Sequence, residues 1–179
     1  MHPRIVSLTT YLTIAVIICD QISKRVITQL LSRTGPLHIT SFLDFNLTIN
    51  HGMNFYIFGH DFSGLVSNFF IVFWLVVFFA FTRWRMYIIS ILEAVGIGCV
   101  MGGAIGDLID RLRFGTVVDF LDFHIGEFHL YTLNLAECAV VAGMFLLVLD
   151  AVIKEGGRKQ TLATQNPRAE RRSPRDTQK

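Results

Sequence analysis

The chain has 179 residues, of which 52% are hydrophobic and only 17% are charged, and its mean hydropathy is +0.50. The formal net charge is +2. This composition is too apolar and too poor in charge for a typical soluble domain, so a membrane protein is the first interpretation.

Long apolar runs recur along the chain. A helix needs about 20 residues to cross the hydrocarbon layer of a membrane. Four stretches reach this length, and they are residues 5–30, 62–82, 86–106 and 133–153. We therefore expect a mainly α membrane protein with four transmembrane helices. The first run ends in Asp20 and Gln21 without the small residues of a signal-peptide cleavage site, so we expect it to be retained as the first span.

Basic residues indicate the orientation, because short cytoplasmic segments carry an excess of Lys and Arg. Residues 154–179 hold eight basic side chains against three acidic ones. Arg83 and Arg85 lie between the second and third spans, and Arg4 precedes the first. We therefore expect both termini in the cytoplasm. The tail, 156–179, has no apolar period, so we expect it to be disordered and to meet anionic lipids, not nucleic acid.

The first loop on the opposite side of the membrane has the pattern of a strand. From Leu43 to Asn50, apolar and polar residues alternate strictly, which is the period of a half-buried β-strand. Open sheet edges do not occur in lipid. We therefore expect a small extracytoplasmic β platform, formed by residues about 35–60 and 112–132, within one membrane domain that spans residues 1–155.

Polar residues from separate stretches fall at the same outer end of this topology. They come from the end of the first span, the first outer loop, the end of the third span, the second outer loop and the start of the fourth span. This clustering predicts a functional site, and its members are Asp20, Lys24, Asn50, Gly52, Asp107, Asp110, Arg111, Asp119, Asn134 and Glu137.

Structural interpretations remain open for some of these residues. Asp20 and Lys24 are four positions apart, hence on one helix face, and are also consistent with a simple ion pair at a helix end. The neighbours Asp110 and Arg111 are also consistent with an interfacial anchor.

Other polar residues are expected to be structural. Glu93 is expected to be a buried hydrogen-bonded group or a contact between helices, and Asp150 an interfacial residue. The histidines show no His-Glu-x-x-His spacing, so no zinc centre is predicted. The cysteines all fall in spans, where we expect them to pack as small apolar residues, and they are Cys19, Cys99 and Cys138.

Two carboxylates near the interface, Asp119 and Glu137, suggest a chemistry. Close like charges push two pKa values apart, so one acid serves as base while the other donates a proton to the substrate carbonyl. Such a pair activates water for peptide hydrolysis. It requires no metal, no cofactor and no covalent intermediate.

The sequence resembles the lipoprotein signal peptidases, the type II aspartic signal peptidases of bacterial inner membranes. Five motifs occur in the family's order over about residues 8–153, with the expected spacing. They are "DQISK" (20–24), "NHGMNF" (50–55), "GGAIGDLIDR" (102–111), "VVDF" (117–120) and "LNLAE" (133–137).

The resemblance implies an inner-membrane enzyme that cuts diacylglyceryl-modified prolipoproteins before their lipid-bearing cysteine, on the periplasmic side. It implies that Asp119 and Glu137 are the catalytic carboxylates. The other eight residues of the cluster would shape the site and hold the substrate. We expect the protein to work as a monomer among membrane lipids, with a prolipoprotein as its partner.

The sequence departs from the family pattern at three positions. Glu137 stands where the family has Asp, Asp107 where it has Asn, and Leu133 where it has Phe. Glu is one methylene longer than Asp, and a misplacement of about 1 Å can cost on the order of 10²-fold in rate. The altered pair leaves open a non-catalytic paralogue that binds lipidated precursors. A small transporter or channel subunit is a further alternative, which rests only on the four spans with buried charges.

Overall fold

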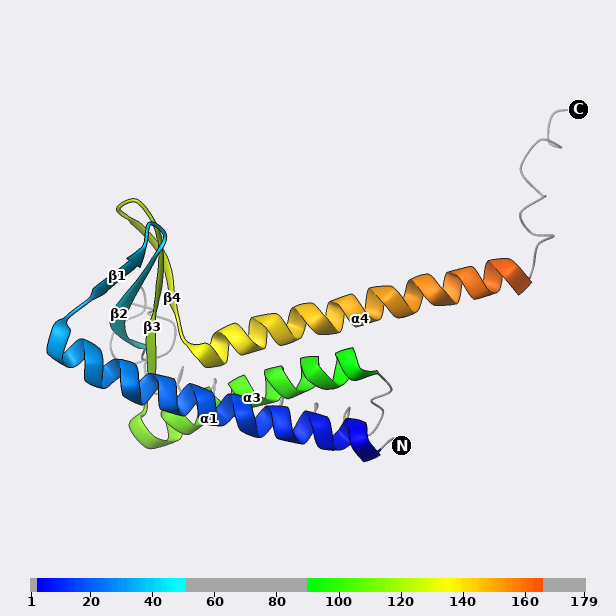
Figure 1. The fold of residues 1–179 in the computed structure, drawn as a ribbon, viewed down its shortest axis with the longest axis horizontal. Coiled ribbons are helices and arrows are strands. Elements are labelled where there is room, and N and C mark those ends of the chain that lie inside the picture. The colour runs from blue at the N-terminus through cyan, green and yellow to red at the C-terminus, as the bar shows by residue number, and fades with distance from the viewer. Residues whose placement is uncertain (1–2, 51–89, 166–179) are drawn as a thin grey trace, which may run out of the picture.

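Three long helices and a small sheet make up the part of the chain that the structure, a computed structural model, describes, which is residues 3–50 and 90–165. The helices lie side by side, and the sheet projects from one end of them (Figure 1). In chain order the elements are α1 (Pro3–Thr34), β1 (Leu37–Thr40), β2 (Leu43–Asn50), α3 (Ile91–Phe114), β3 (Val117–Ile125), β4 (Phe128–Leu133) and α4 (Leu135–Gln165).

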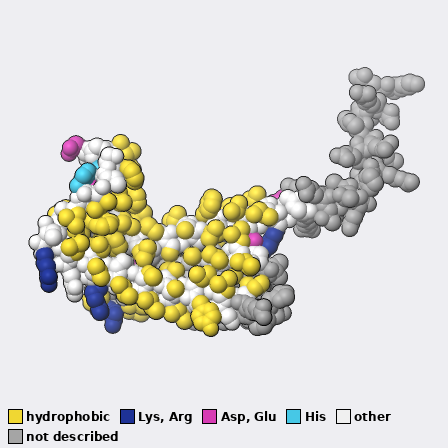
Figure 2. Space-filling model, viewed as in Figure 1, with side chains coloured by type: hydrophobic (Ala, Val, Ile, Leu, Met, Phe, Trp, Pro, Cys, Tyr) yellow, Lys and Arg dark blue, Asp and Glu magenta, His cyan; other side chains and the backbone are white. Residues whose placement is uncertain are grey.

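All three helices are long and apolar enough to cross a membrane, over Ile5–Thr34, Ile91–Phe114 and Leu135–Gly157. In α3, 67% of the apolar window is buried, against 17% in each of the other two. Helix α3 is therefore the central one, and α1 and α4 pack against it. The apolar side chains that α1 and α4 leave exposed form the hydrophobic surface seen in Figure 2, as expected for helices that face lipid.

Glycines bring the helix backbones close together, as is common in membrane helix pairs. A Cβ atom at Gly102 would lie 2.6 Å from Val16 Cβ on α1, and one at Gly103 would overlap the backbone oxygen of Ala136 on α4. These two neighbours on α3 thus face different partner helices. The close approach on both sides fixes the three helices at the level where α4 begins.

A group of polar contacts joins the start of α3 to the C-terminal half of α4. Lys154 Nζ lies 2.9 Å from Glu93 Oε2 and 2.6 Å from Asp150 Oδ2. The Ser90 hydroxyl donates to Asp150 Oδ1 (2.6 Å) and accepts from the Glu93 backbone N–H (3.0 Å), which caps α3. The prediction that Glu93 is a buried contact between helices is confirmed, and Asp150 takes part in the same contact.

The four strands form one antiparallel sheet in the order β1-β2-β3-β4. Strand β2 pairs with β3 so that Thr48 lies opposite Asp119 and Asn50 opposite Val117. This register brings the end of β2 next to Asp119. The predicted strand at Leu43–Asn50 and the small sheet are confirmed.

Three of the four predicted spans correspond to the described helices and differ from them at their ends. The second, 62–82, lies outside the described residues, as does the part of the β platform from 51 to 60. Helix α3 continues past the predicted end at 106 to Phe114, and Gly115 ends it in a left-handed conformation with φ 72°. Helix α4 continues to Gln165, so the prediction that the chain is disordered from residue 156 is wrong for 156–165.

The glycine contacts predict a loss of stability in Gly103→Ala. Forcing a methyl group against the Ala136 oxygen should cost about 1–3 kcal/mol of the free energy of unfolding. In a chain of this size that corresponds to a fall of roughly 2–12 °C in Tm, measured by thermal unfolding in detergent. Gly156→Ala is the control, because Gly156 is an exposed helical residue with open space around its Cβ position. Equal Tm values for the two variants would contradict this account.

Candidate active site

Asp119 lies on β3 with only 1% of its surface exposed. Two amides hold its carboxylate: Asn50 donates to Oδ2 (2.9 Å) and Asn134 donates to Oδ1 (2.6 Å). Burial raises the pKa of Asp119 above its ordinary value, and the two amides and the charges of Lys24 and Arg111 oppose that rise. The carboxylate is therefore fixed in position and holds its proton more tightly than an exposed Asp.

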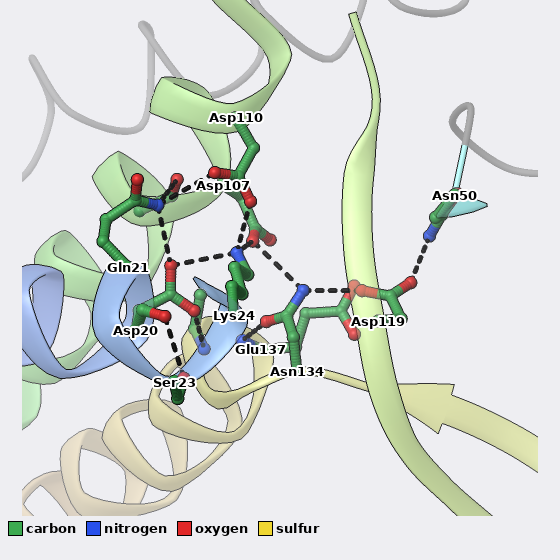
Figure 3. A network of polar contacts seen from close by, with 12 residues as sticks. Asp20, Gln21, Ser23, Lys24, Asn50, Asp107, Asp110, Asp119, Asn134 and Glu137 are labelled. Atoms are coloured by element: carbon green, nitrogen blue, oxygen red, sulfur yellow. Dashed lines mark hydrogen bonds and ion pairs between the residues drawn. The ribbon is translucent and has the colours of Figure 1, made fainter. Parts of the chain in front are cut away.

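Glu137 lies in the first turn of α4, and its side chain extends toward Asp119 (Figure 3). Its backbone N–H donates to Asn134 Oδ1 (2.8 Å), so Asn134 caps the helix that carries Glu137. The Glu137 Oε2 atom is closed to solvent and makes no hydrogen bond within the described residues. Asn134 thus holds Asp119 with its NH₂ group and the start of α4 with its oxygen.

Lys24 is buried among three carboxylates at the other end of this network (Figure 3). Its Nζ atom lies 2.9 Å from Asp20, 2.9 Å from Asp107 and 2.7 Å from Asp110. The predicted ion pair between Asp20 and Lys24 is therefore present, but it is part of a larger cluster that joins α1 to α3. The three acids are also close enough to hold a metal ion, and the Lys24 ammonium already supplies a cation to them.

Two further contacts connect this cluster to the carboxylate pair. Asn134 Nδ2 also lies 3.2 Å from Asp107 Oδ1, so it stands between Asp107 and Asp119. On the other side, Asp20 Oδ1 accepts a hydrogen bond from the Ala136 backbone N–H (3.0 Å) in the first turn of α4. Helix α1 therefore positions the start of α4 directly, through a residue adjacent to Glu137.

The structure brings together most of the residues that the sequence predicted. Gly52 lies outside the described residues. Arg111 is buried on α3 with 8% of its surface exposed, close enough for its charge to act on Asp119. The other eight members contact one another directly or through a shared partner, and they are Asp20, Lys24, Asn50, Asp107, Asp110, Asp119, Asn134 and Glu137.

Sequence reasoning missed two residues near the site. Gln21 donates to Asp110 Oδ1 (2.9 Å) and to Asp20 Oδ2 (3.2 Å), and its place inside the motif "DQISK" was the available signal. Tyr131 on β4 is the second. Partial burial raises the pKa of Tyr131, and the charges of Glu137 and Asp119 raise it further. Nothing in the sequence pattern pointed to Tyr131.

Comparisons with known proteins agree with this geometry. The sequence pattern of the family described as Signal peptidase (SPase) II matches residues 12–153. A lipoprotein signal peptidase of Coxiella burnetii (strain Dugway 5J108-111) is 38% identical over 145 residues, covering 78% of this chain and 86% of that protein. One of Hydrogenovibrio crunogenus is 36% identical over 144 residues, covering 79% and 83%.

The fold has a counterpart among solved structures. A bacterial membrane enzyme, determined by the in meso method at 1.9 Å resolution, superposes with a TM-score of 0.68 at 23% identity. The match covers 80% of this chain and 91% of that one. From the family pattern over most of its length and the identity to these relatives, the chain belongs to the signal peptidase II family of aspartic peptidases.

Proposed function

We propose that the protein removes the signal peptide from diacylglyceryl-modified prolipoproteins, cutting before the lipidated cysteine, and that Asp119 and Glu137 activate the attacking water. One observation carries the assignment of these residues. Asn134 binds the Asp119 carboxylate through its NH₂ group and caps the helix of Glu137 through its oxygen, so Asp119 and the turn that carries Glu137 meet at one junction of β3 and α4.

In the proposed mechanism Asp119 is the base. Its two amide donors stabilise the ionised form, and they fix the carboxylate where it can take a proton from water. Glu137 supplies the second acid, which donates a proton to the scissile carbonyl oxygen as water attacks. As the tetrahedral intermediate collapses, the leaving amine takes the proton held by Asp119 and one of the two hydroxyl groups returns a proton to Glu137. The products are an amine and a carboxylic acid, and the pair is back in its starting state.

The same residues suggest how the substrate is held. A lipidated precursor keeps its acyl chains in the bilayer, so its scissile bond lies at the membrane surface. We assign that surface to the periplasmic side of the inner membrane, with both termini in the cytoplasm and the sheet outside. Asn50 at the end of β2 and Arg111 near the end of α3 are proposed to hold the substrate backbone, together with Gly52, which lies outside the described residues. The enzyme is proposed to act as a monomer.

A catalytically impaired paralogue is the second candidate. The observation that favours it is the longer side chain at Glu137, which moves the second carboxylate by about one carbon-carbon bond relative to the Asp of the family. Since a displacement of about 1 Å can cost on the order of 10²-fold in rate, binding without cleavage is a distinct outcome.

Neutralising either acid tests the pair. Asp119→Asn and Glu137→Gln keep the side-chain shape but remove the charge, so each should lower kcat/KM by at least about 10²–10⁴-fold. The assay is cleavage of a diacylglyceryl prolipoprotein by purified enzyme, followed by gel mobility or mass spectrometry. Glu127→Gln is the control, because Glu127 is an exposed carboxylate on the turn between β3 and β4. Full activity in Asp119→Asn would refute the assignment.

Glu137→Asp separates the two candidates. If the site is adapted to glutamate, shortening the side chain withdraws the carboxylate by about 1 Å, and kcat should fall by on the order of 10²-fold. If the protein is an impaired paralogue, the starting enzyme is inactive and Glu137→Asp gains activity. Measuring single-turnover cleavage by both proteins with the same substrate decides between them.

The pH dependence follows from the pKa of Asp119. A base must be ionised, so activity should fall as the pH drops through its pKa, and burial places that pKa above the ordinary 3.8. Removing the Asn50 amide takes away a donor that stabilises the charged form. Asn50→Ala should therefore move the acid limb of the kcat/KM profile to higher pH, while Glu127→Gln leaves it in place. A shift toward lower pH would contradict the role of Asp119 as base.

A further inference from the structure

A second polar cluster lies in the sheet, apart from the carboxylate pair. It contains His38 on β1, Asp44 on β2 and His124 on β3. His38 Nδ1 lies 2.6 Å from Asp44 Oδ1, and His124 Nε2 lies 3.4 Å from the same oxygen. One donor atom from each residue lies within 4.8 Å of the other two. The hydrogen bonds and ion pairs of these three side chains do not involve Asp119, Asn134 or Lys24.

The tautomer of His124 is set by its neighbour. His124 Nδ1 lies 3.1 Å from the carbonyl oxygen of Gly126, and a carbonyl oxygen only accepts hydrogen bonds, so Nδ1 carries the hydrogen. In the neutral ring the lone pair is then on Nε2. That atom is buried, makes no hydrogen bond within the described residues and faces the Asp44 carboxylate. Two lone pairs facing each other repel, so a positive charge is needed between them.

A second carboxylate on the sheet makes a positive charge near Asp44 more favourable. Asp44 lies opposite Asp122 in the pairing of β2 with β3. Like charges directly opposite each other destabilise a sheet. His129 bonds Asp122 (2.8 Å) and so serves the second carboxylate, not the first. The charge of Asp44 is therefore met within its own group of three, where a proton or a metal ion can lie between the imidazoles and the carboxylate.

We propose that His38, Asp44 and His124 bind one divalent transition metal ion, with Zn²⁺ as the best match. Two imidazole nitrogens and one carboxylate oxygen are donors that zinc favours. Bonds of 2.0–2.1 Å in a tetrahedron separate the ligand atoms by roughly 3.3 Å, close to the 3.4 Å between His124 Nε2 and Asp44 Oδ1. The hydrogen on Nδ1 of His124 donates to a carbonyl, as in other metal-binding imidazoles.

One adjustment completes the site. His38 Nδ1 and Asp44 Oδ1 are joined by a hydrogen bond of 2.6 Å. These two atoms become metal ligands only when Nδ1 loses its proton and the His38 ring turns slightly. The His38 side chain is 67% exposed, so it is free to make this movement. Solvent takes the fourth position. A bound ion would join the hairpin of β1 and β2 to β3, which lies far from it in the sequence.

The test uses the full chain purified in detergent without a polyhistidine tag. Titration with Co²⁺, which gives visible absorption bands in a tetrahedral site, should saturate at one ion per chain, and Zn²⁺ should displace it. His38→Ala and His124→Ala should each weaken Co²⁺ binding by at least about 100-fold, since even outer partners of metal ligands cost 10–100-fold. His129→Ala is the matched control and should stay within about 3-fold of the starting protein.

A second readout covers variants that fold poorly. Zn²⁺ should raise the Tm of the starting protein and of His129→Ala, because an ion that binds only the folded state stabilises it. It should not raise the Tm of His38→Ala, whose exposed side chain is not needed for packing. Absence of saturable Co²⁺ absorption, or an unchanged affinity in His38→Ala, would overturn the proposal and leave a shared proton as the charge between these groups.

Discussion

The Lys24 ammonium, buried among Asp20, Asp107 and Asp110, is the interaction on which the site depends. Burying one charge without partners costs several kcal/mol, so an apolar helix pair tolerates these acids only because a cation lies within 3 Å of each. The same contacts tie α1 to α3. Removing the ammonium would leave three buried carboxylates repelling one another beside Asp119.

Asn134 extends this constraint from the helices to the sheet. Its amide reaches Asp107 on α3 and Asp119 on β3, and its oxygen caps α4. An ordinary helix cap contributes about 1 kcal/mol. Here the cap also orients a carboxylate, so the residue that starts the last helix positions the proposed chemistry as well. Stability and activity would change together at this residue.

Much of this arrangement could be predicted from the sequence, for identifiable reasons. Apolar runs of about 20 residues predicted the helices, and the alternation of apolar and polar residues predicted β2. The position of the polar residues at one end of the spans predicted that Asp20, Lys24 and Asn134 belong to one site. The end of α3 was predicted too early because it was taken from the apolar length, whereas Gly115 after Arg111 and Arg113 is a local signal for a helix end. Local patterns could not bring His38 and His124 together, because their proximity depends on how β1, β2 and β3 pair, and no linear spacing encodes that pairing.

Asp107 and Glu137 are connected through the amide of Asn134. A carboxylate at 107 only accepts hydrogen bonds, whereas an Asn there would offer both a donor and an acceptor. Asp107 therefore directs the Asn134 NH₂ group toward itself and Asp119. That orientation leaves the Asn134 oxygen to cap the turn that carries Glu137. The negative charge of Asp107 is met by Lys24 at 2.9 Å. Asn134 thus contacts the Asp107 side chain with its NH₂ group and the backbone of Glu137 with its oxygen, so one side chain connects the two residues.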